Sequence, residues 1–391
     1  MNNPHPLKAI VCVLALLAAS CAAPRRGGPG GPSSELRLHF LGDFNIPTGA
    51  RFNDLDPSMF GGLSSLSYEP ASGTILALSD AKADYRLYRL SITVSPGRLE
   101  VRPRGVFFLR DADGNPFPAA ALDPEGLAPA PDGSLYISSE RHGLGKTVPG
   151  LFRFSAAGEL LRILSVPEKF LPSEEGEGLR GTRPNASFEA LALAPDEPRL
   201  FTAAENALYQ DGGPSGPDKG SLVRILEIDV SAGGDEAPAA EFAYPLDEMA
   251  VPDGSGPGRG DIGLVEILAL GGREFLSLER SYFIEDAGPR PRRSRTRIRI
   301  YRFSLDGAED IRDVPSLKES GPVRPVRKEL VLDFGGIVGR LTPGFRSLDN
   351  FEAMGFGPVL ENGNRTLLLV SDNNFSPTQR TVFLAFEVIP R

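Results

Sequence analysis

The sequence contains few of the residues that most often carry thiol or imidazole chemistry. Its two cysteines, Cys12 and Cys21, both lie near the N-terminus. The rest of the chain therefore offers no disulfide, no thiolate metal site and no cysteine nucleophile. Beyond the N-terminal segment the only histidines are His39 and His142. This count leaves few candidates for a Ser-His-Asp triad and excludes a histidine-rich zinc centre.

Several motifs are absent as well. The sequence has no G-x-S-x-G nucleophile elbow and no phosphate-binding P-loop. Beyond the N-terminal segment, no apolar run reaches the ~18 residues that a bilayer-spanning helix needs. The net charge of −9 argues against a nucleic-acid partner. After these exclusions, a mechanism that uses carboxylates and a metal ion is what remains.

The N-terminus has the features of an export signal. Lys8 precedes the apolar run Ala9–Ala19, and small residues lead to Cys21. Leu17-Ala18-Ala19-Ser20-Cys21 resembles a bacterial lipobox, in which the cysteine becomes the lipidated first residue, and ordinary signal cleavage nearby is the alternative. We expect a periplasmic or cell-envelope lipoprotein that meets the membrane only through this anchor. The expected parts are a signal at 1–21, a flexible Gly- and Pro-rich tether at 22–34, and one domain at 35–391.

One unit, a β-hairpin with a polar residue at each end, recurs five times. It is clearest in DPEGLAPAPDGSLYISSE, where Glu125 opens an apolar arm, Pro131-Asp132-Gly133 makes a turn and the second arm ends at Glu140. Because the turn lies midway between them, the two glutamates are expected to face each other across the open end. The other four hairpins run from Ser64 to Asp80, from Glu189 to Glu205, from Glu266 to Glu279 and from Glu352 to Asp372.

Strand units that recur at this length predict an all-β propeller. The last unit has only three strands, and the alternating strand Leu36–Asp43 is expected to complete it and close the ring. We favour five blades, and a sixth degenerate blade hidden in the insertions at 167–186, 206–220 or 304–328 is the alternative. The five blades are expected at about 61–109, 123–166, 187–245, 263–335 and 350–389.

The acids of the hairpins are expected to meet at one mouth of the central channel. In a propeller blade, the start of the first strand and the end of the second share one face. Unpaired carboxylates would repel one another there, and Ca²⁺, which takes about 6–8 oxygen ligands, would relieve the repulsion. The alternative is that each acid bonds amides or arginines of a neighbouring blade and is purely structural. The candidate metal ligands are Asp80, Glu125, Glu140, Glu189, Glu205, Glu266, Glu279, Glu352 and Asp372.

Basic residues follow the second strands and are expected to overhang the same face. Acids that hold a metal, surrounded by Lys and Arg, suit a small anionic substrate such as a phosphate ester. No nucleophile is assigned from the sequence. The alternative function is a non-catalytic propeller lipoprotein that binds a ligand or a protein through one face. The candidate substrate-binding residues are Lys82, Arg141, Lys146, Arg280 and Arg380.

Four stretches of the sequence resemble the phytase-like family, also labelled esterase-like activity of phytase. They are GGLSSLSYEPASGTILALSD at 61–80, DPEGLAPAPDGSLYISSE at 123–140, SFEALALAPDEPRLFTAAE at 187–205 and NFEAMGFGP at 350–358. The resemblance implies an exported β-propeller and suggests a metal-assisted phosphoesterase. The DADDPAIW-like motif of β-propeller phytases is matched only by Asp111-Ala112-Asp113-Gly114-Asn115-Pro116, which argues against phytate as the substrate.

Overall fold

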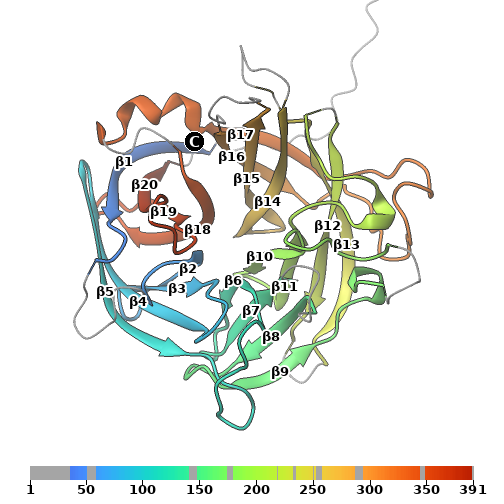
Figure 1. Ribbon diagram of the computed structural model, residues 1–391, viewed down its shortest axis with the longest axis horizontal. Helices are drawn as coiled ribbons and strands as arrows, with labels where there is room; N and C mark the ends of the chain where they lie inside the picture. The colour runs from blue at the N-terminus through green and yellow to red at the C-terminus, as the bar shows by residue number, and fades with distance from the viewer. Residues whose placement is uncertain are drawn as a thin grey trace, which may run out of the picture. The chain divides into compact units, whose positions relative to one another are not determined.

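The structure is a computed structural model whose described residues form five antiparallel four-stranded sheets. The sheets are arranged like blades around a central axis (Figure 1). The fold is therefore an all-β propeller with five blades, as the repeats predicted. Within the described residues each sheet has four strands, and the alternative of a sixth blade is not realised. The described residues are 36–50, 59–140, 148–173, 179–217, 219–231, 235–249, 251, 258–286, 294–343 and 348–389.

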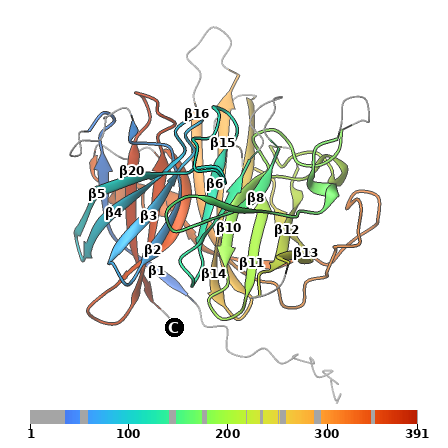
Figure 2. The same ribbon diagram turned by 90° about the horizontal axis from the view of Figure 1, so that it is seen from below.

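The first four blades are built from strands that follow one another in the chain. In each of them, the first strand lies next to the axis and contacts the first strands of other blades, and the remaining strands lie progressively outward (Figure 1). Figure 2 shows the same blades from the side. The strands of blades one and two are β2 (Leu63–Glu69), β3 (Thr74–Ser79), β4 (Arg86–Ser95), β5 (Arg98–Phe108), β6 (Pro124–Pro129), β7 (Leu135–Ser139), β8 (Gly150–Phe154) and β9 (Leu160–Leu164). Those of blades three and four are β10 (Phe188–Leu193), β11 (Arg199–Ala204), β12 (Ser221–Asp229), β13 (Ala237–Leu246), β14 (Gly258–Gly271), β15 (Glu274–Glu285), β16 (Ser294–Ser304) and β17 (Arg327–Asp333).

Blade five joins the two ends of the described chain. Its strands are β18 (Asn350–Val359), β19 (Arg365–Asp372), β20 (Thr381–Ile389) and, outermost, β1 (Arg37–Ile46). In the β1–β20 ladder, Arg37 lies opposite Ile389 and Ile46 opposite Thr381. The prediction that the N-terminal strand completes the last blade is confirmed.

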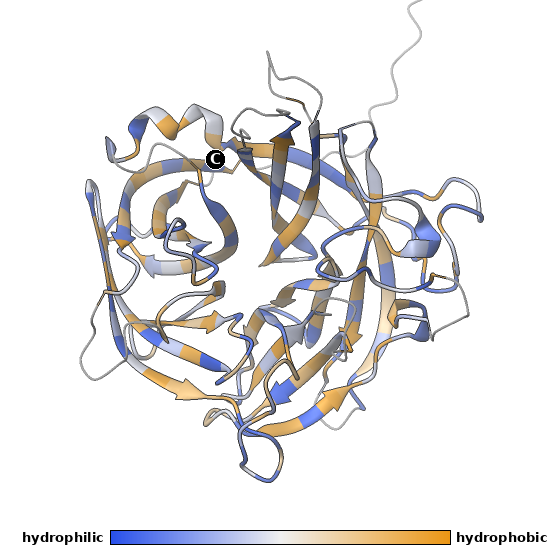
Figure 3. Cartoon of the chain, viewed as in Figure 1, coloured by the Kyte–Doolittle hydropathy of each residue, from blue (hydrophilic) through white to orange (hydrophobic). Residues whose placement is uncertain are grey.

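The hydrophobic core lies between neighbouring blades. Hydrophobic and hydrophilic positions both occur along the strands (Figure 3), and clusters of buried apolar residues join neighbouring sheets. The aromatic rings of Phe201 in blade three and Phe275 in blade four are 4.9 Å apart, and Phe275 stacks on Phe303 at 5.2 Å. Within the described part of the chain, no helix has the length and apolar character that crossing a bilayer requires.

The insertion between β16 and β17 packs on the outer strand of blade three. The backbone N–H groups of Ile311 and Val326 donate to carbonyls of β13, each at 2.9 Å. Beneath them, the fully buried Arg224 pairs with Asp211 at 2.7 Å and with Glu241 at 2.8 Å. The insertion therefore covers the edge of blade three rather than forming a blade. Four short 3₁₀ turns complete the described elements: η2 (Glu168–Phe170), η3 (Tyr209–Asp211), η4 (Phe334–Gly336) and η5 (Val338–Arg340).

Candidate functional site

Each inner strand carries a β-bulge near its start. The strand registers shift at Glu125 in β6, at Glu189 in β10 and at Glu352 in β18. A bulge inserts one residue into the ladder and changes the direction of its side chain. All three glutamates line one cavity. The bulge is therefore the local device that turns an inner-strand glutamate towards the channel mouth.

Four acids from the ends of the second strands line the same cavity. The backbone N–H groups of Asp80, Glu140 and Glu205 donate to the carbonyls of the residues that precede β2, β6 and β10, at 2.7–2.8 Å. Asp372 ends β19 in the equivalent position, opposite Asn350. The predicted convergence at one mouth is therefore found for seven of the nine candidate acids.

We call this cavity of about 820 Å³ the acidic mouth. The described part of its walls contains nine carboxylates and two cations, Lys82 and Arg280. The cations are already paired within the wall. The carboxylates of the acidic mouth belong to Asp80, Asp123, Glu125, Glu140, Glu189, Glu205, Asp349, Glu352 and Asp372.

Two predicted ligands, Glu266 and Glu279, do not line the acidic mouth. In β14 the bulge falls on Val265, so Glu266 lies one residue past the position of Glu125 and Glu189. A shift of one residue turns a strand side chain to the other face. The same shift places Glu279 opposite Leu264, as Ser139 lies opposite Pro124. The predicted hairpin from Glu266 to Glu279 was therefore wrong by one residue at each end, when compared with the hairpin from Glu189 to Glu205.

Both displaced carboxylates have protein partners. Glu266 accepts hydrogen bonds from the Ser65 hydroxyl at 3.1 Å and from the backbone N–H of Ile267 at 3.0 Å. Glu279 accepts from the Tyr244 hydroxyl and from the Lys328 ammonium, each at 2.6 Å. The contacts of these two residues are therefore those expected of purely structural acids, which was the alternative to metal binding.

Arg280 occupies the position in blade four where the other blades have an acid. It lies opposite Gly263, one residue after Glu279. Its guanidinium is 3.0 Å from the Glu205 carboxylate and 3.4 Å from that of Glu352, and it donates to the Asn350 side chain at 2.6 Å. An arginine thus interrupts the ring of acids and neutralises part of its charge.

The other predicted cations have different positions. Lys82 lines the acidic mouth and pairs with Asp123 and, at 3.6 Å, with Asp80. Arg380 is exposed and is not among the described residues of the mouth wall, although its backbone N–H donates to the Asp349 carboxylate at 3.0 Å. The two remaining candidates, Arg141 and Lys146, lie outside the described residues.

Several acids of the mouth hold their protons more tightly than free acids do. Burial raises the pKa of Glu125, Glu140 and Glu189 well above its ordinary value, and repulsion between neighbouring carboxylates raises it further. Burial also raises the pKa of Glu205 to about 7, although Arg280 opposes the rise. Burial would lower the pKa of Lys82, but the carboxylates around it outweigh that effect and raise it. Ionising these carboxyls together is therefore unfavourable, and an incoming cation would relieve that cost.

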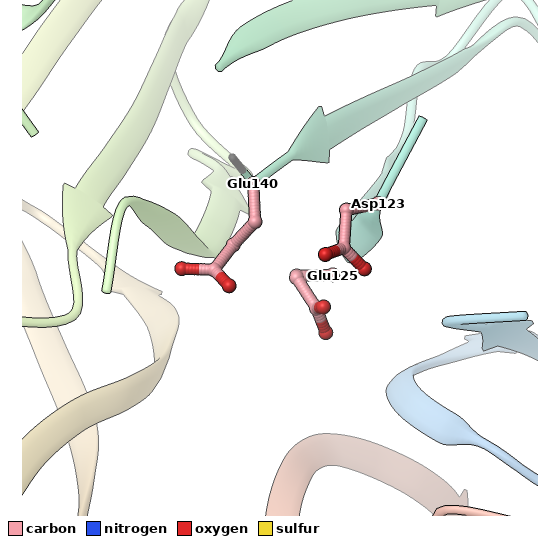
Figure 4. A group of neighbouring side chains, drawn as sticks. All are labelled: Asp123, Glu125 and Glu140. Atoms are coloured by element: carbon pink, nitrogen blue, oxygen red, sulfur yellow. The ribbon is translucent and has the colours of Figure 1, made fainter. Parts of the chain in front are cut away.

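Glu140 lies at the centre of the acidic mouth. One of its oxygens lies within 4.8 Å of oxygens from Asp123 and Glu125, and the same limit holds within a second group, Glu140, Glu189 and Glu205. Figure 4 shows the first group projecting into one space from the ends of β6 and β7. Three hard oxygen donors so close together are a typical Ca²⁺ or Mg²⁺ ligand set. The residues present therefore fit a hard divalent cation.

A further sign of a missing partner is Asp80. Its Oδ1 is buried and has no hydrogen-bond partner among the described residues. A buried carboxylate oxygen without a donor is costly unless an ion or water meets it. Asp80 belongs to blade one, so it supports a cation site from a third blade, in addition to the acids of blades two and three.

The sequence prediction missed Asp123. It lies just before β6, and the equivalent positions before β10 and at the start of β18 are Ser187 and Asn350. A polar residue in three of the five repeats at this point was a signal in the printed sequence. It was overlooked because only acids at strand starts and ends were compared.

Comparison with known proteins gives one strong match. The family model described as phytase-like, esterase-like activity of phytase, matches residues 58–375. None of the curated proteins matches the sequence.

Solved structures give only distant likenesses. One is a calcium-binding regucalcin from Agrobacterium tumefaciens strain C58, at 14% identity over 88% of this chain and 96% of that chain, with a TM-score of 0.32. Another is a gluconolactonase from Xanthomonas campestris, at 12% identity over 93% of this chain and 99% of that chain, with a TM-score of 0.30. At such scores they carry nothing about the chemistry of the acidic mouth.

Proposed function

Because the chain belongs to the phytase-like family, described by the esterase-like activity of phytase, we propose that it is a calcium-assisted hydrolase of phosphate esters that acts at the acidic mouth. The observation that carries the proposal is the pair of carboxylate groups that share Glu140. Such a cluster would bind no anion by itself, since its own charge is negative. A bound cation would reverse the local charge and make the mouth suitable for an anionic ester.

Different residues of the acidic mouth would hold the cation and orient the substrate. Asp123, Glu125 and Glu140 would hold the cation, and Glu189 and Glu205 would hold a second one or complete the shell of the first. When bound, the cation polarises a phosphoryl oxygen and lowers the pKa of water. Lys82 in blade one and Arg280 in blade four flank the group from opposite sides of the ring and would orient the ester oxygens.

We expect the purified protein to hydrolyse an aryl phosphate only when calcium is present. The carboxylates that hold the ion cannot also bind the ester, so the metal-free mouth repels the substrate. Release of nitrophenol from nitrophenyl phosphate, followed with calcium, with chelator and after calcium is restored, measures this. Activity that is unchanged by a chelator would contradict the metal-assisted mechanism.

The same assay separates the proposal from its alternative. A propeller that binds a ligand without chemistry needs no metal and would give no turnover on any ester, with or without calcium. A carboxylic ester, such as nitrophenyl acetate, serves as the comparison substrate. Cleavage of that ester and not of the phosphate would keep the hydrolase and change the substrate class.

We propose further that the protein is exported and held at the cell envelope by a lipid on Cys21. The lipobox-like segment and the lone apolar run before it support this placement. We expect Cys21→Ser to move the protein from the membrane fraction to the soluble fraction, while the matched variant Cys12→Ser stays membrane-bound. Fractionation followed by immunoblotting measures the distribution, and equal membrane retention of both variants would contradict the anchor.

A further inference from the structure

The inner strands end at a second cavity, distinct from the acidic mouth. The mouth is lined by residues at the starts of these strands, whereas the second cavity is lined by residues from their middles and far ends, in all five blades. We call it the apolar funnel. Its volume of about 550 Å³ lies within the range of small-molecule sites.

The walls of the funnel are apolar and its rim is rigid. Leucine, isoleucine, valine, alanine, methionine, phenylalanine and proline residues together form most of the lining. Four blades each contribute one proline to it, and proline fixes the backbone and offers no N–H donor. The four are Pro70, Pro129, Pro195 and Pro358. The prolines therefore help to preform the funnel, in which polar atoms remain between the apolar side chains.

Glu266, the displaced acid of blade four, also lines the funnel. It is 2% exposed, and its carboxylate accepts hydrogen bonds from blades one, three and four, through Ser65, Leu191 and Ile267. Its acceptors are thus occupied by the protein. Glu266 therefore offers no donor to an anionic ligand, whose negative charge would need a cation elsewhere in the lining.

Among the described residues of the funnel wall, Arg365 is the one cation. Its guanidinium carbon lies 3.3 Å from the centroid of the Phe356 ring, and both residues line the cavity. Among the described residues, its side chain has no carboxylate or other hydrogen-bond partner, unlike Arg153 or Arg297, which pair with aspartates. Stacking on the ring holds the guanidinium in place while its N–H donors remain available.

We propose that the apolar funnel binds a small amphipathic monoanion, with the apolar body inside and a carboxylate on Arg365. The volume of the funnel limits the size of the apolar part of the ligand, and the lining favours its apolar character. Arg365, which is unpaired among the described residues, favours a negative charge on the ligand. The site is separate from the acidic mouth and does not depend on the function proposed for it.

Dodecanoate, below the concentration at which it aggregates, is the probe. Isothermal titration calorimetry with the metal-stripped protein in chelator-treated buffer excludes calcium soaps and any bridge through the acidic mouth. We expect one site, with binding weakened about tenfold in Arg365→Gln, since a charged hydrogen bond is lost. In Arg365→Glu we expect no dodecanoate binding and new binding of the cation dodecyltrimethylammonium.

The matched control is Arg102→Gln, which changes an exposed arginine on β5 and should bind dodecanoate like the wild type. A far-UV circular dichroism spectrum and a cooperative thermal unfolding transition like those of the wild type show that each Arg365 variant is folded. Equal dodecanoate affinity in wild type and Arg365→Gln, or equal affinity of the wild type for neutral dodecanol, would overturn the proposal. So would concentration-dependent dimers in sedimentation with no dodecanoate binding, since a second copy would then fill the funnel.

Discussion

Calcium should raise the unfolding temperature of the wild-type protein and leave that of Glu140→Gln unchanged. Glu140 belongs to both carboxylate groups, so its loss removes one ligand from each. At a calcium concentration 100 times the Kd, binding stabilises the folded state by about 2.7 kcal/mol, or about 4 °C for a chain of this size. Differential scanning calorimetry with and without calcium measures the shift.

The control for this experiment is Glu266→Gln. It neutralises another buried channel glutamate, but one that lies outside the acidic mouth and is bonded to the backbone of its own and a neighbouring blade. We expect it to lower the unfolding temperature and to keep the full calcium shift. A calcium shift that survives in Glu140→Gln, or that disappears in Glu266→Gln, would mean that the ion binds elsewhere.

Without metal, the protein should lose stability as the pH rises from 5 to 8. A carboxyl group whose pKa is higher in the folded state than in the unfolded chain binds its proton more tightly when folded. Its contribution is complete below the unfolded pKa and is lost as the pH passes through the folded one. For Glu205, the window runs from 4.5 to about 7, and the loss is about 3 kcal/mol. Glu125, Glu140 and Glu189 shift in the same direction and add to it.

Denaturant unfolding of metal-stripped protein at pH 5, 6, 7 and 8 measures this slope. Calcium should oppose it, because the ion replaces protons and binds better as the pH rises. The matched variant Glu205→Gln should flatten the curve by the contribution of one group. Asp333, whose pKa Arg297 holds low against the effect of burial, titrates below this window and does not disturb it. Stability that rises between pH 5 and 7 in metal-free protein would contradict the buried, repelling carboxylates.

The blade count and the closure of the ring could be predicted from the sequence because both follow from period. Alternating apolar residues and turns mark each hairpin, and a three-stranded last unit requires a fourth strand from elsewhere. β1 pairs with β20 as expected. Such features depend on many residues at once, so no single misread position changes the outcome.

The candidate site was less accessible, because it depends on single positions. In blade four the bulge is at Val265, and Glu266 lies one residue beyond it along the strand. The sequence around Glu266 does not show whether Val265 or Glu266 takes the bulge, since the strand is apolar on both sides of them. The pairing of β14 with β15 decides the register, and that pairing places Arg280 in the ring of acids. The face on which a side chain lies is thus decided by the pairing of the two strands and cannot be read from the residues of one strand.

The pairing of Arg37 with Ile389 has a consequence for how the chain matures. It joins residues separated by nearly the full sequence. Contacts between residues so far apart in the sequence form late in folding, because a very large loop must close first. A polypeptide still emerging from a ribosome or translocon cannot complete blade five, and a nascent chain that stops before β20 leaves β1 without its partner. Conversely, a short linker between residues 389 and 37 should permit new ends to be cut in a surface turn, giving a circular permutant with the same ring.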